Sequence, residues 1–385
     1  MSDVALAAIG SLFLWSYALA SPVAGLLADR FSRSRLVVFS LLAWSLVTTL
    51  TAFSPSESFL LSARVLLGLS ECLYLPAAIA LIADYHSDSS RGSAMAIHIA
   101  GLNAGMIVGG SLGGYLGQHF GWRTMFLALG GVGLLFAVIC RFVLRDRPVD
   151  EEAGRELTPP AGSTGMLESL RGILSVPTYA VIVVQAMLVS VSLWIFANWL
   201  PLYFSETLHM SLAGAGFSGT FTIQSAGVIG NIAGGFASDR VARRKLRGRM
   251  LLQCVCLFAA SPFLLSFIWS KSFLLVSSST FCFELFATMA ASAEHPILCD
   301  VLDPRLRSTA IGCMNTANCL AGGTGILLAG VFKHDLGLGT IFGCASSVIL
   351  LAALLVLVGY VFLIDHDLER RSGFPDKPAA VPIAL

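Results

Sequence analysis

Long apolar stretches separated by short polar segments make up most of this 385-residue chain. Each stretch is close to the length of about 20 residues that a helix needs to cross the core of a lipid bilayer. None of them alternates apolar and polar residues as the strands of a membrane barrel do, and helices are the other structure that satisfies the backbone in lipid. We therefore predict an all-α membrane protein with eleven spans, near residues 4–28, 36–54, 58–85, 92–118, 122–144, 177–204, 212–237, 249–269, 272–300, 306–332 and 340–364.

The composition is that of a membrane protein and argues against nucleic-acid binding and metal binding. Hydrophobic residues make up 56% of the chain and charged residues 12%, and the mean hydropathy is +0.80. The formal net charge of +1 provides no cationic field that would attract nucleic acid. The cysteines lie in apolar stretches without a CxxC pair or a Cys/His cluster. We therefore predict packing thiols, no metal site and no cofactor.

The sequence lacks two common motifs, that of ATP-driven pumps and that of zinc-dependent hydrolases. There is no GxxxxGK[ST] loop that would hold nucleotide phosphates, and no HExxH zinc motif. We predict that the protein is not an enzyme and that it does not draw energy from ATP.

The cations are distributed unequally between the loops on the two sides of the predicted spans. One side has only Arg123, Lys271 and Lys333, whereas the loops of the other side hold almost all the remaining Lys and Arg. Because cytoplasmic loops retain these residues, we predict that the C-terminus is cytoplasmic and that residue 1 lies outside. The expected location is the inner or plasma membrane of the cell, as a multi-pass protein.

A motif of one glycine and three charged residues, here called the signature, follows an apolar stretch and recurs 210 residues later. A second pair, one aspartate and one arginine, recurs 216 residues later. Two parallel halves of this kind are typical of transporters that bind their solute between the halves, near the middle of the membrane. The first copies are Gly25, Asp29, Arg30, Arg33, Asp84 and Arg91, and the second copies are Gly235, Asp239, Arg240, Arg243, Asp300 and Arg307.

The repeat defines the expected domain organisation. We predict an N-terminal helical half (1–144), a charged, proline-containing cytoplasmic linker (145–171), a C-terminal helical half (172–364) and a disordered cytoplasmic tail (365–385). The second half has two stretches up to its copy of the signature, whereas the first half has one. We expect five plus six helices out of twelve, with the first helix missing; the alternative is that eleven spans are native.

The doubled signature and the plan of two halves resemble the major facilitator superfamily over nearly the whole chain. The segment GLLADRFSR (residues 25–33) matches the family loop G-x-L-A-D-[RK]-x-G-[RK], except that Ser32 stands where Gly is usual. The resemblance implies a gate of charge-assisted bonds that fastens the cytoplasmic side in the outward-open state. Its members would be Asp29, Arg30, Arg33, Asp84, Arg91, Asp239, Arg240 and Arg243. The alternative is that these charges only set the topology.

Arg64 and Glu71 are charges inside one apolar stretch, where burial is costly and usually marks a solute or ion path. Seven residues of helix place them about 20° apart on one face and about 10 Å apart along the axis. Arginine offers a rigid fork to an anion, and a carboxyl in an apolar setting can load and release protons. We predict a substrate anchor at Arg64 and a proton carrier at Glu71; the alternative is a structural pair. The segment from Arg64 to Pro76 resembles the matching helix of the Spinster-like and anion:cation symporter branches.

Other polar groups in the apolar stretches are secondary candidates. We expect Glu284, Asn198 and Asn231 to line the opposite half of the cavity. Glu294 and His98 are either pathway residues or partners of neighbouring helices. The stripe Gly101, Gly105, Gly109, Gly113 and Gly117 predicts close helix packing. It resembles the antiporter motif of this helix, but Gly110 replaces the motif's Pro.

The sequence favours a monomeric secondary transporter that moves a small organic anion by alternating access, coupled to protons or sodium. Three alternatives stay open: a Spinster-like carrier of a lysolipid or sphingoid head group, a drug efflux antiporter, and a non-transporting sensor or truncated inactive product.

Overall fold

The computed structural model describes residues 1–86, 88–146, 166–303 and 306–372, and every regular element within these ranges is a helix. The predicted all-α class is confirmed. The N-terminal half contains α1 (Asp3–Arg30), α2 (Arg33–Thr51), α3 (Glu57–Glu71), α4 (Tyr74–Tyr85), α5 (Asp88–Phe120) and α6 (Trp122–Val143). The C-terminal half contains α8 (Met166–Leu174), α9 (Pro177–Glu206), α10 (Leu212–Ala242), α11 (Gly248–Ala260), the 3-10 helix η1 (Ser261–Leu265), α12 (Ser266–Trp269), α13 (Phe273–Ala291), α14 (Glu294–Val301), α15 (Arg307–Phe362) and α16 (Ile364–Ser372).

Nine helical segments of the described chain are long and apolar enough to cross a membrane. They include α3 with α4, α11 with α12 and α13 with α14, each pair forming one span. The 31-residue α10 is not among the nine but coincides with a predicted stretch. With α10 added and α15 counted as two spans, the helices match the eleven stretches predicted from the sequence.

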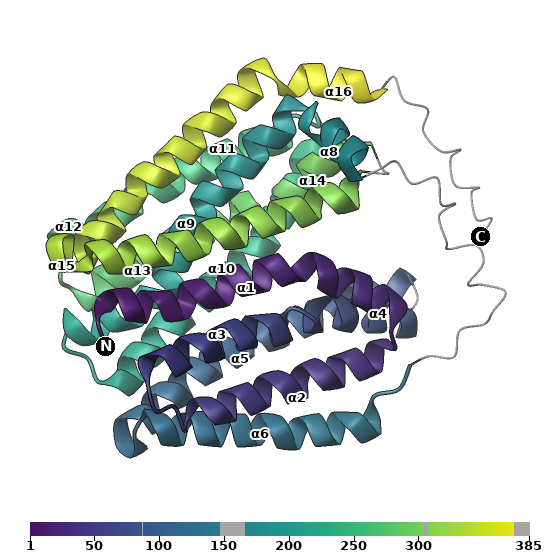
Figure 1. The fold of residues 1–385 in the computed structure, drawn as a ribbon. Coiled ribbons are helices and arrows are strands. Elements are labelled where there is room, and N and C mark those ends of the chain that lie inside the picture. Colours follow the sequence, from purple (N-terminus) through teal and green to yellow (C-terminus); the bar gives the residue numbers. More distant parts are fainter. Residues whose placement is uncertain (87, 147–165, 304–305, 373–385) are drawn as a thin grey trace.

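Helix α15 reverses direction at Gly337. A continuous helix of its 56 residues would be about 84 Å long, far more than a bilayer crossing needs. The backbone of Gly337 has φ 75° and ψ 153°, a conformation that residues with a side chain rarely adopt. The two arms of α15 therefore cross the bundle in opposite directions (Figure 1).

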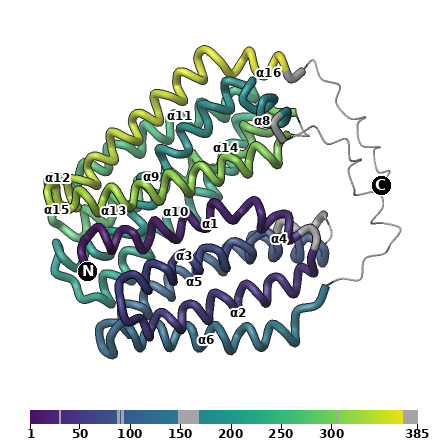
Figure 2. The backbone as a smooth tube through the Cα atoms, in the orientation of Figure 1, coloured from purple at the N-terminus to yellow at the C-terminus, as the bar shows by residue number. Residues whose placement is uncertain are grey.

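The two halves lie one above the other, and α1 runs along the boundary between them (Figures 1 and 2). The C-terminal half has an aromatic core in which the rings of Phe196 and Phe342 stack with centroids 4.3 Å apart, and Tyr203 and Phe267 pack against them. Half of the most apolar part of α9 is buried, whereas none of that part of α5 is. The C-terminal half is therefore the more densely packed of the two.

We call the end of the bundle that contains Asp3 and Lys333 the outer end, and the end that contains α8 and α16 the inner end, following the predicted orientation. The most extensive contacts between the halves are those of α1 with α15 and of α5 with α10. The hydrogen bonds that join the halves among the described residues lie between the middle of these helices and the outer end. They link Trp15 to Leu320, Gln118 to Ala213, Gln224 to Met106 and Lys333 to Asp3.

Toward the inner end, glycines on the same four helices have open space beside them. An added Cβ at Gly25, Gly101, Gly235 or Gly312 would meet no atom within 4 Å. At Gly110 it would lie 2.5 Å from Thr220, a residue of the opposite half. The described hydrogen bonds between the halves lie from the middle to the outer end, and the two halves diverge toward the inner end (Figure 1).

The predicted disordered tail begins too early. Residues 364–372 form α16, and Asp367 is only 2% exposed. Its Oδ2 accepts a hydrogen bond of 2.9 Å from the backbone nitrogen of Thr178, at the start of α9. Arg370 donates to the carbonyl oxygen of Ser175. These contacts fold residues 365–372 onto the C-terminal half, so the prediction is wrong for them; residues 373–385 and most of the predicted linker (147–165) lie outside the described ranges.

Two alanine substitutions on α5 test the contact with α10. In Gly114→Ala the new Cβ would lie 2.5 Å from the backbone oxygen of Leu212, and we expect overpacking to cost about 1–3 kcal/mol. Gly105→Ala meets nothing within 4 Å and should gain about 0.5–1 kcal/mol of helix stability. Melting temperatures in detergent should shift in opposite directions. Equal shifts of the two variants would show that α5 does not pack on α10 through Gly114.

Candidate functional site

A cavity of about 510 Å³ lies between the two halves near the middle of the bundle. Its volume falls in the range of small-molecule sites. Its polar lining comes from both halves and contains a cation, amides and a hydroxyl but no carboxylate. The lining residues are Ile9, Gly10, Phe13, Arg64, Met106, Gly109, Gly110, Trp194, Ala197, Asn198, Gly219, Thr220, Ile223 and Gln224.

Arg64 of α3 is the cation of this cavity. Its guanidinium carbon lies 5.5 Å from the centroid of the Phe126 ring of α6, a cation–π contact. One turn later, Gly68 lets α3 approach α1 so closely that an added Cβ would lie 2.5 Å from the carbonyl oxygen of Phe13. No described carboxylate lies within ion-pair distance of Arg64. The cation predicted to anchor a substrate therefore lines the cavity without a direct ion pair to a described carboxylate.

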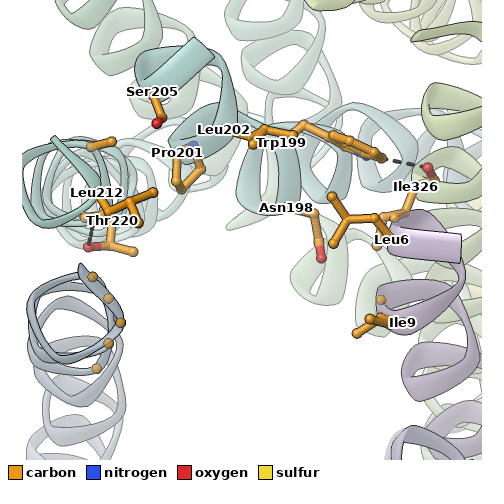
Figure 3. A pocket seen from close by; sticks show the side chains of 18 residues that line it. Leu6, Ile9, Asn198, Trp199, Pro201, Leu202, Ser205, Leu212, Thr220 and Ile326 are labelled. Atoms are coloured by element: carbon orange, nitrogen blue, oxygen red, sulfur yellow. Dashed lines mark hydrogen bonds between the residues drawn. The ribbon is translucent and has the colours of Figure 1, made fainter. Parts of the chain in front are cut away.

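Asn198 of α9 lines the same cavity from the opposite half, as predicted. Its side-chain nitrogen donates 3.0 Å to the carbonyl oxygen of Trp194, which leaves its side-chain oxygen without a described donor. Asn198 also lines a second, mostly apolar cavity of about 480 Å³ that extends toward the outer end. Figure 3 shows Asn198 pointing into this second cavity, near Leu6 and Ile9 of α1.

Gln224 and Thr220 of α10 line the first cavity and were not among the predicted site residues. The Gln224 amide donates 3.0 Å to the Met106 sulfur, a weak acceptor. Asn231, which was predicted, lies seven residues beyond Gln224 and so on nearly the same face of α10, about 10 Å nearer the inner end. It is exposed but lines neither of these two cavities.

Glu71 is the last residue of α3 and is partly buried. It lies within electrostatic range of Arg64 and of Tyr17 in α1, but it does not form an ion pair with Arg64. The helix is interrupted immediately after it, at Cys72 and Leu73. Pro76 explains the interruption, because it lacks the N–H that would bond to the carbonyl of Cys72. The predicted proton carrier therefore stands beside a break in the span.

The C-terminal half repeats this arrangement. Its span is interrupted at Ser292 and Ala293, four and three residues before Pro296, and Glu294 follows the interruption. The Glu294 carboxylate is buried, and it accepts 3.3 Å from the Gln185 amide, whose oxygen accepts 2.7 Å from Gln253. Glu294 is therefore part of a buried polar network inside its own half. The sequence analysis did not single out either glutamine.

Glu284 is also buried, at 6% exposure, in the middle of α13. An added Cβ at Gly227 of α10 would lie 3.8 Å from its Oε1. It lines neither of the two cavities, so the structure does not bring it to Arg64 as predicted. The reason is packing: α10 lies between Glu284 and the cavity and presents Thr220 and Gln224 to it.

Two further predicted features lie in α5, namely His98 and the glycine stripe. The His98 ring lies 5.8 Å from the Tyr74 ring, within the N-terminal half. Of the stripe, Gly101, Gly105, Gly109 and Gly117 have no neighbour within 4 Å of an added Cβ. The prediction of packing through the stripe is therefore wrong: α5 contacts α10 through Gly110 and Gly114, on an adjacent face, and Gly109, Gly113 and Gly117 line the second cavity.

The predicted gating charges lie at the inner end. In the N-terminal half Arg33 forms an ion pair with Asp84, at the end of α4. In the C-terminal half the equivalent cation is Arg249, which pairs with Asp300 at 2.6 Å and with Asp239 at 3.4 Å. The sequence alone identifies Arg249 only as one of the many cations in the loops of the predicted cytoplasmic side. Each of these pairs stays within one half.

The structure describes the side chains of only some of the remaining residues of the predicted gate. The side chains of Asp29, Arg30 and Arg91 lie outside the described residues. Arg240 and Arg243 are exposed, and the described residues give them no ion pair.

Asp146 follows α6 and caps the start of α2. Its Oδ1 accepts 2.8 Å from the backbone nitrogen of Ser34, and its Oδ2 accepts from the hydroxyl of Ser32. Partial burial by itself would raise the pKa of Asp146, but the bonds from Ser32 and Ser34 and the charge of Arg35 hold this pKa below its usual value. Asp146 therefore ties the end of α6 to the signature loop.

Comparisons with known proteins agree with this geometry. The sequence matches the description Major Facilitator Superfamily over residues 1–325 and again over 221–383. It is 25% identical over 339 residues to the human voltage-gated purine nucleotide uniporter SLC17A9, covering 85% of this chain and 76% of that protein. It is 26% identical over 355 residues to probable anion transporter 3, chloroplastic, of Arabidopsis thaliana, covering 86% of this chain and 68% of that protein.

One solved structure shares the fold at low sequence identity. It is a bacterial homolog of the human lysosomal transporter Spinster, in an inward-facing and unoccupied conformation. The TM-score is 0.76 at 19% identity, covering 98% of this chain and 92% of that one.

Asp146→Asn tests the cap on α2. A carboxylate whose pKa is lowered on folding stabilises the protein above its unfolded pKa, about 3.9, and this contribution is lost as pH falls through the lower folded value. We expect the variant to melt about 1 °C lower at pH 7, with the same difference from pH 5 to 8 and a smaller one below pH 4. Glu168→Gln, at an exposed position of α8, is the control. A difference that grew on acidification would contradict the capping role.

Proposed function

Because this chain belongs to the major facilitator superfamily, we propose that it carries an organic anion across the membrane by alternating access of the inter-half cavity. The superfamily match and the named relatives support a multi-pass membrane transporter. The anionic solute, the proton coupling and the roles of single residues are the proposal.

The observation that carries the proposal is the environment of Arg64. A cation inside a membrane protein is costly unless it is paired. Arg64 contacts the face of Phe126 and lies within electrostatic range of Glu71, but it forms no ion pair among the described residues. A carboxylate or phosphate bound in the cavity would supply the missing charge and two parallel hydrogen bonds. Asn198 and Gln224 would contact the solute from the other half, so that a bound anion joins the two halves.

The buried carboxyls support proton coupling. Glu71 lies within electrostatic range of Arg64 without forming an ion pair, whereas Glu284 and Glu294 are buried in the C-terminal half without a described ion pair. Ionisable residues within membrane spans are rare and often belong to a proton or solute path. We propose that Glu71 exchanges the coupled proton, because a proton on it would change the charge next to Arg64. Glu284 and Glu294 would be secondary proton sites.

The separation of the halves toward the inner end supports an inward-facing state. In this state the inner-end charges pair within each half, as Arg33 with Asp84 and Arg249 with Asp300. In the outward-facing state the inner ends of the halves would meet, and the signature charges could then bond across the boundary.

Uptake into proteoliposomes under an imposed pH gradient tests the transport class. The panel should include inorganic phosphate and ATP as phosphates, and gluconate and citrate as carboxylates. Accumulation of a panel member that requires an acidic compartment on one side supports the proposal. Flux of a lysolipid with no flux of the four anions would favour a lipid carrier instead.

Arg64→Lys should weaken binding of the transported anion. Lysine keeps the charge but loses the fork that makes two parallel bonds, so we expect the affinity to fall by about 10- to 100-fold. Arg123→Lys is the matched control, because Arg123 also contacts an aromatic ring but bonds to the Ser54 carbonyl away from both cavities. An unchanged affinity in Arg64→Lys, measured by titration of the purified protein, would remove Arg64 from the site.

Glu71→Gln should abolish uphill accumulation while exchange down a solute gradient survives. The amide keeps the size and hydrogen-bonding capacity of the acid but cannot carry a proton. The comparison is counterflow against gradient-driven uptake in the same proteoliposomes, with Glu57→Gln at an exposed position of the same helix as control. Uphill accumulation that persists in Glu71→Gln would exclude Glu71 as the obligatory carrier.

A further inference from the structure

Lys333 lies at the outer end, on the first arm of α15, between two carboxylates. Its Nζ is 2.8 Å from Oδ1 of Asp3 and 3.0 Å from Oε2 of Glu206. Its side chain is 13% exposed, and its ammonium lies 5.8 Å from the centroid of the Trp199 ring. This cation is therefore partly desolvated and held in one place.

The two carboxylates belong to different halves of the molecule. Asp3 is the first residue of α1, in the N-terminal half, and Glu206 is the last residue of α9, in the same half as Lys333. Among the ion pairs that join described residues, Asp3–Lys333 is the one that crosses between the halves.

The surrounding backbone holds Asp3 and Lys333 in register. Ser2 caps α1 by accepting 3.1 Å from the backbone nitrogen of Ala5, which fixes the first turn. Gly330, one turn before Lys333, lets α15 approach α1 so closely that an added Cβ would lie 2.8 Å from the carbonyl oxygen of Asp3. The ion pair therefore sits on a tight contact between the helices.

We propose that Asp3 and Lys333 form a latch that closes the outer end of the inter-half cavity and opens when the transporter turns outward. Opening that end requires α1 to leave α15, which breaks the pair. Lys333 then keeps Glu206, which moves with it because both belong to the C-terminal half. Glu206 prevents the cation from being stranded in the open state, so that the latch can open and close repeatedly. The proposal rests on relative motion of the halves and not on the identity of the solute.

Distances between spin labels at the outer end provide the test. Labels would be placed at Phe53→Cys and Leu336→Cys, two exposed positions in opposite halves, in a chain whose native cysteines are replaced. We expect Lys333→Gln and Asp3→Asn to raise the population of the longer distance, relative to the shorter one, by about three- to tenfold, as for loss of a partly buried ion pair.

Two matched variants separate the latch from a general effect of charge. Glu206→Gln removes the partner that Lys333 keeps in the open state, so it should not raise the population of the longer distance. Lys271→Gln removes an exposed lysine that forms no described ion pair and should shift the population less than twofold. An unchanged distribution in Asp3→Asn, or an equal shift in Lys271→Gln, would overturn the proposal.

Hydrogen exchange in the chain with its native cysteines is a second measurement, in case the cysteine replacements disturb the fold. Peptides from residues 1–15 and 326–336 should exchange faster in Lys333→Gln and Asp3→Asn than in Glu206→Gln. Equal exchange in all three variants would contradict the latch. Neither measurement needs a solute, so the latch can fail while the proposed role of Arg64 holds, and the reverse.

Discussion

A charge inside a lipid bilayer has to find its partners within the protein, because the lipid tails offer none. The described charges of this chain meet that constraint in different ways. Lys333 has two carboxylates, one from each half. Glu294 has an amide from its own half. Arg64 has an aromatic face, an open cavity and Glu71 within electrostatic range, and the anion that we propose would complete its pairing.

The same constraint accounts for the unequal packing of the halves. The C-terminal half encloses its polar groups behind an aromatic core, and glycines of α15 let the large side chains of α9 approach it: an added Cβ at Gly325 would lie 2.9 Å from Val191. In the N-terminal half, no residue in the most apolar part of α5 is buried, and glycines of this helix line the second cavity. The C-terminal half is therefore the better packed of the two, and the N-terminal half supplies the more open wall of the cavities.

The spans, the repeat and the placement of Arg64 could be predicted from the sequence, because they depend on hydropathy and on spacing along one helix. The residues that meet Arg64 could not, since they depend on how one helix is rotated against another. Glu284 was expected in the cavity, but α10 presents Gln224 there instead. Lys333 was recognised only as an outer-side cation, because nothing in the sequence places residue 3 beside residue 333. The packing face of α5 was misassigned for the same reason: a period of four residues identifies a stripe but not its neighbour.

The interruption after Glu71 makes α4 a lever. Its 12 residues span about 18 Å from the proline-induced break to Tyr85, and Asp84 is near the far tip. A change of about 10° in the angle at the break would move that tip by about 3 Å, as the same helical rise implies. Ion pairs hold over distances of that order, so such a change in the backbone next to Glu71 would alter the contact of Asp84 with Arg33. If Glu71 exchanges a proton as we propose, the rigid length of α4 would link that event to the inner end without a chain of coupled side chains between the two places.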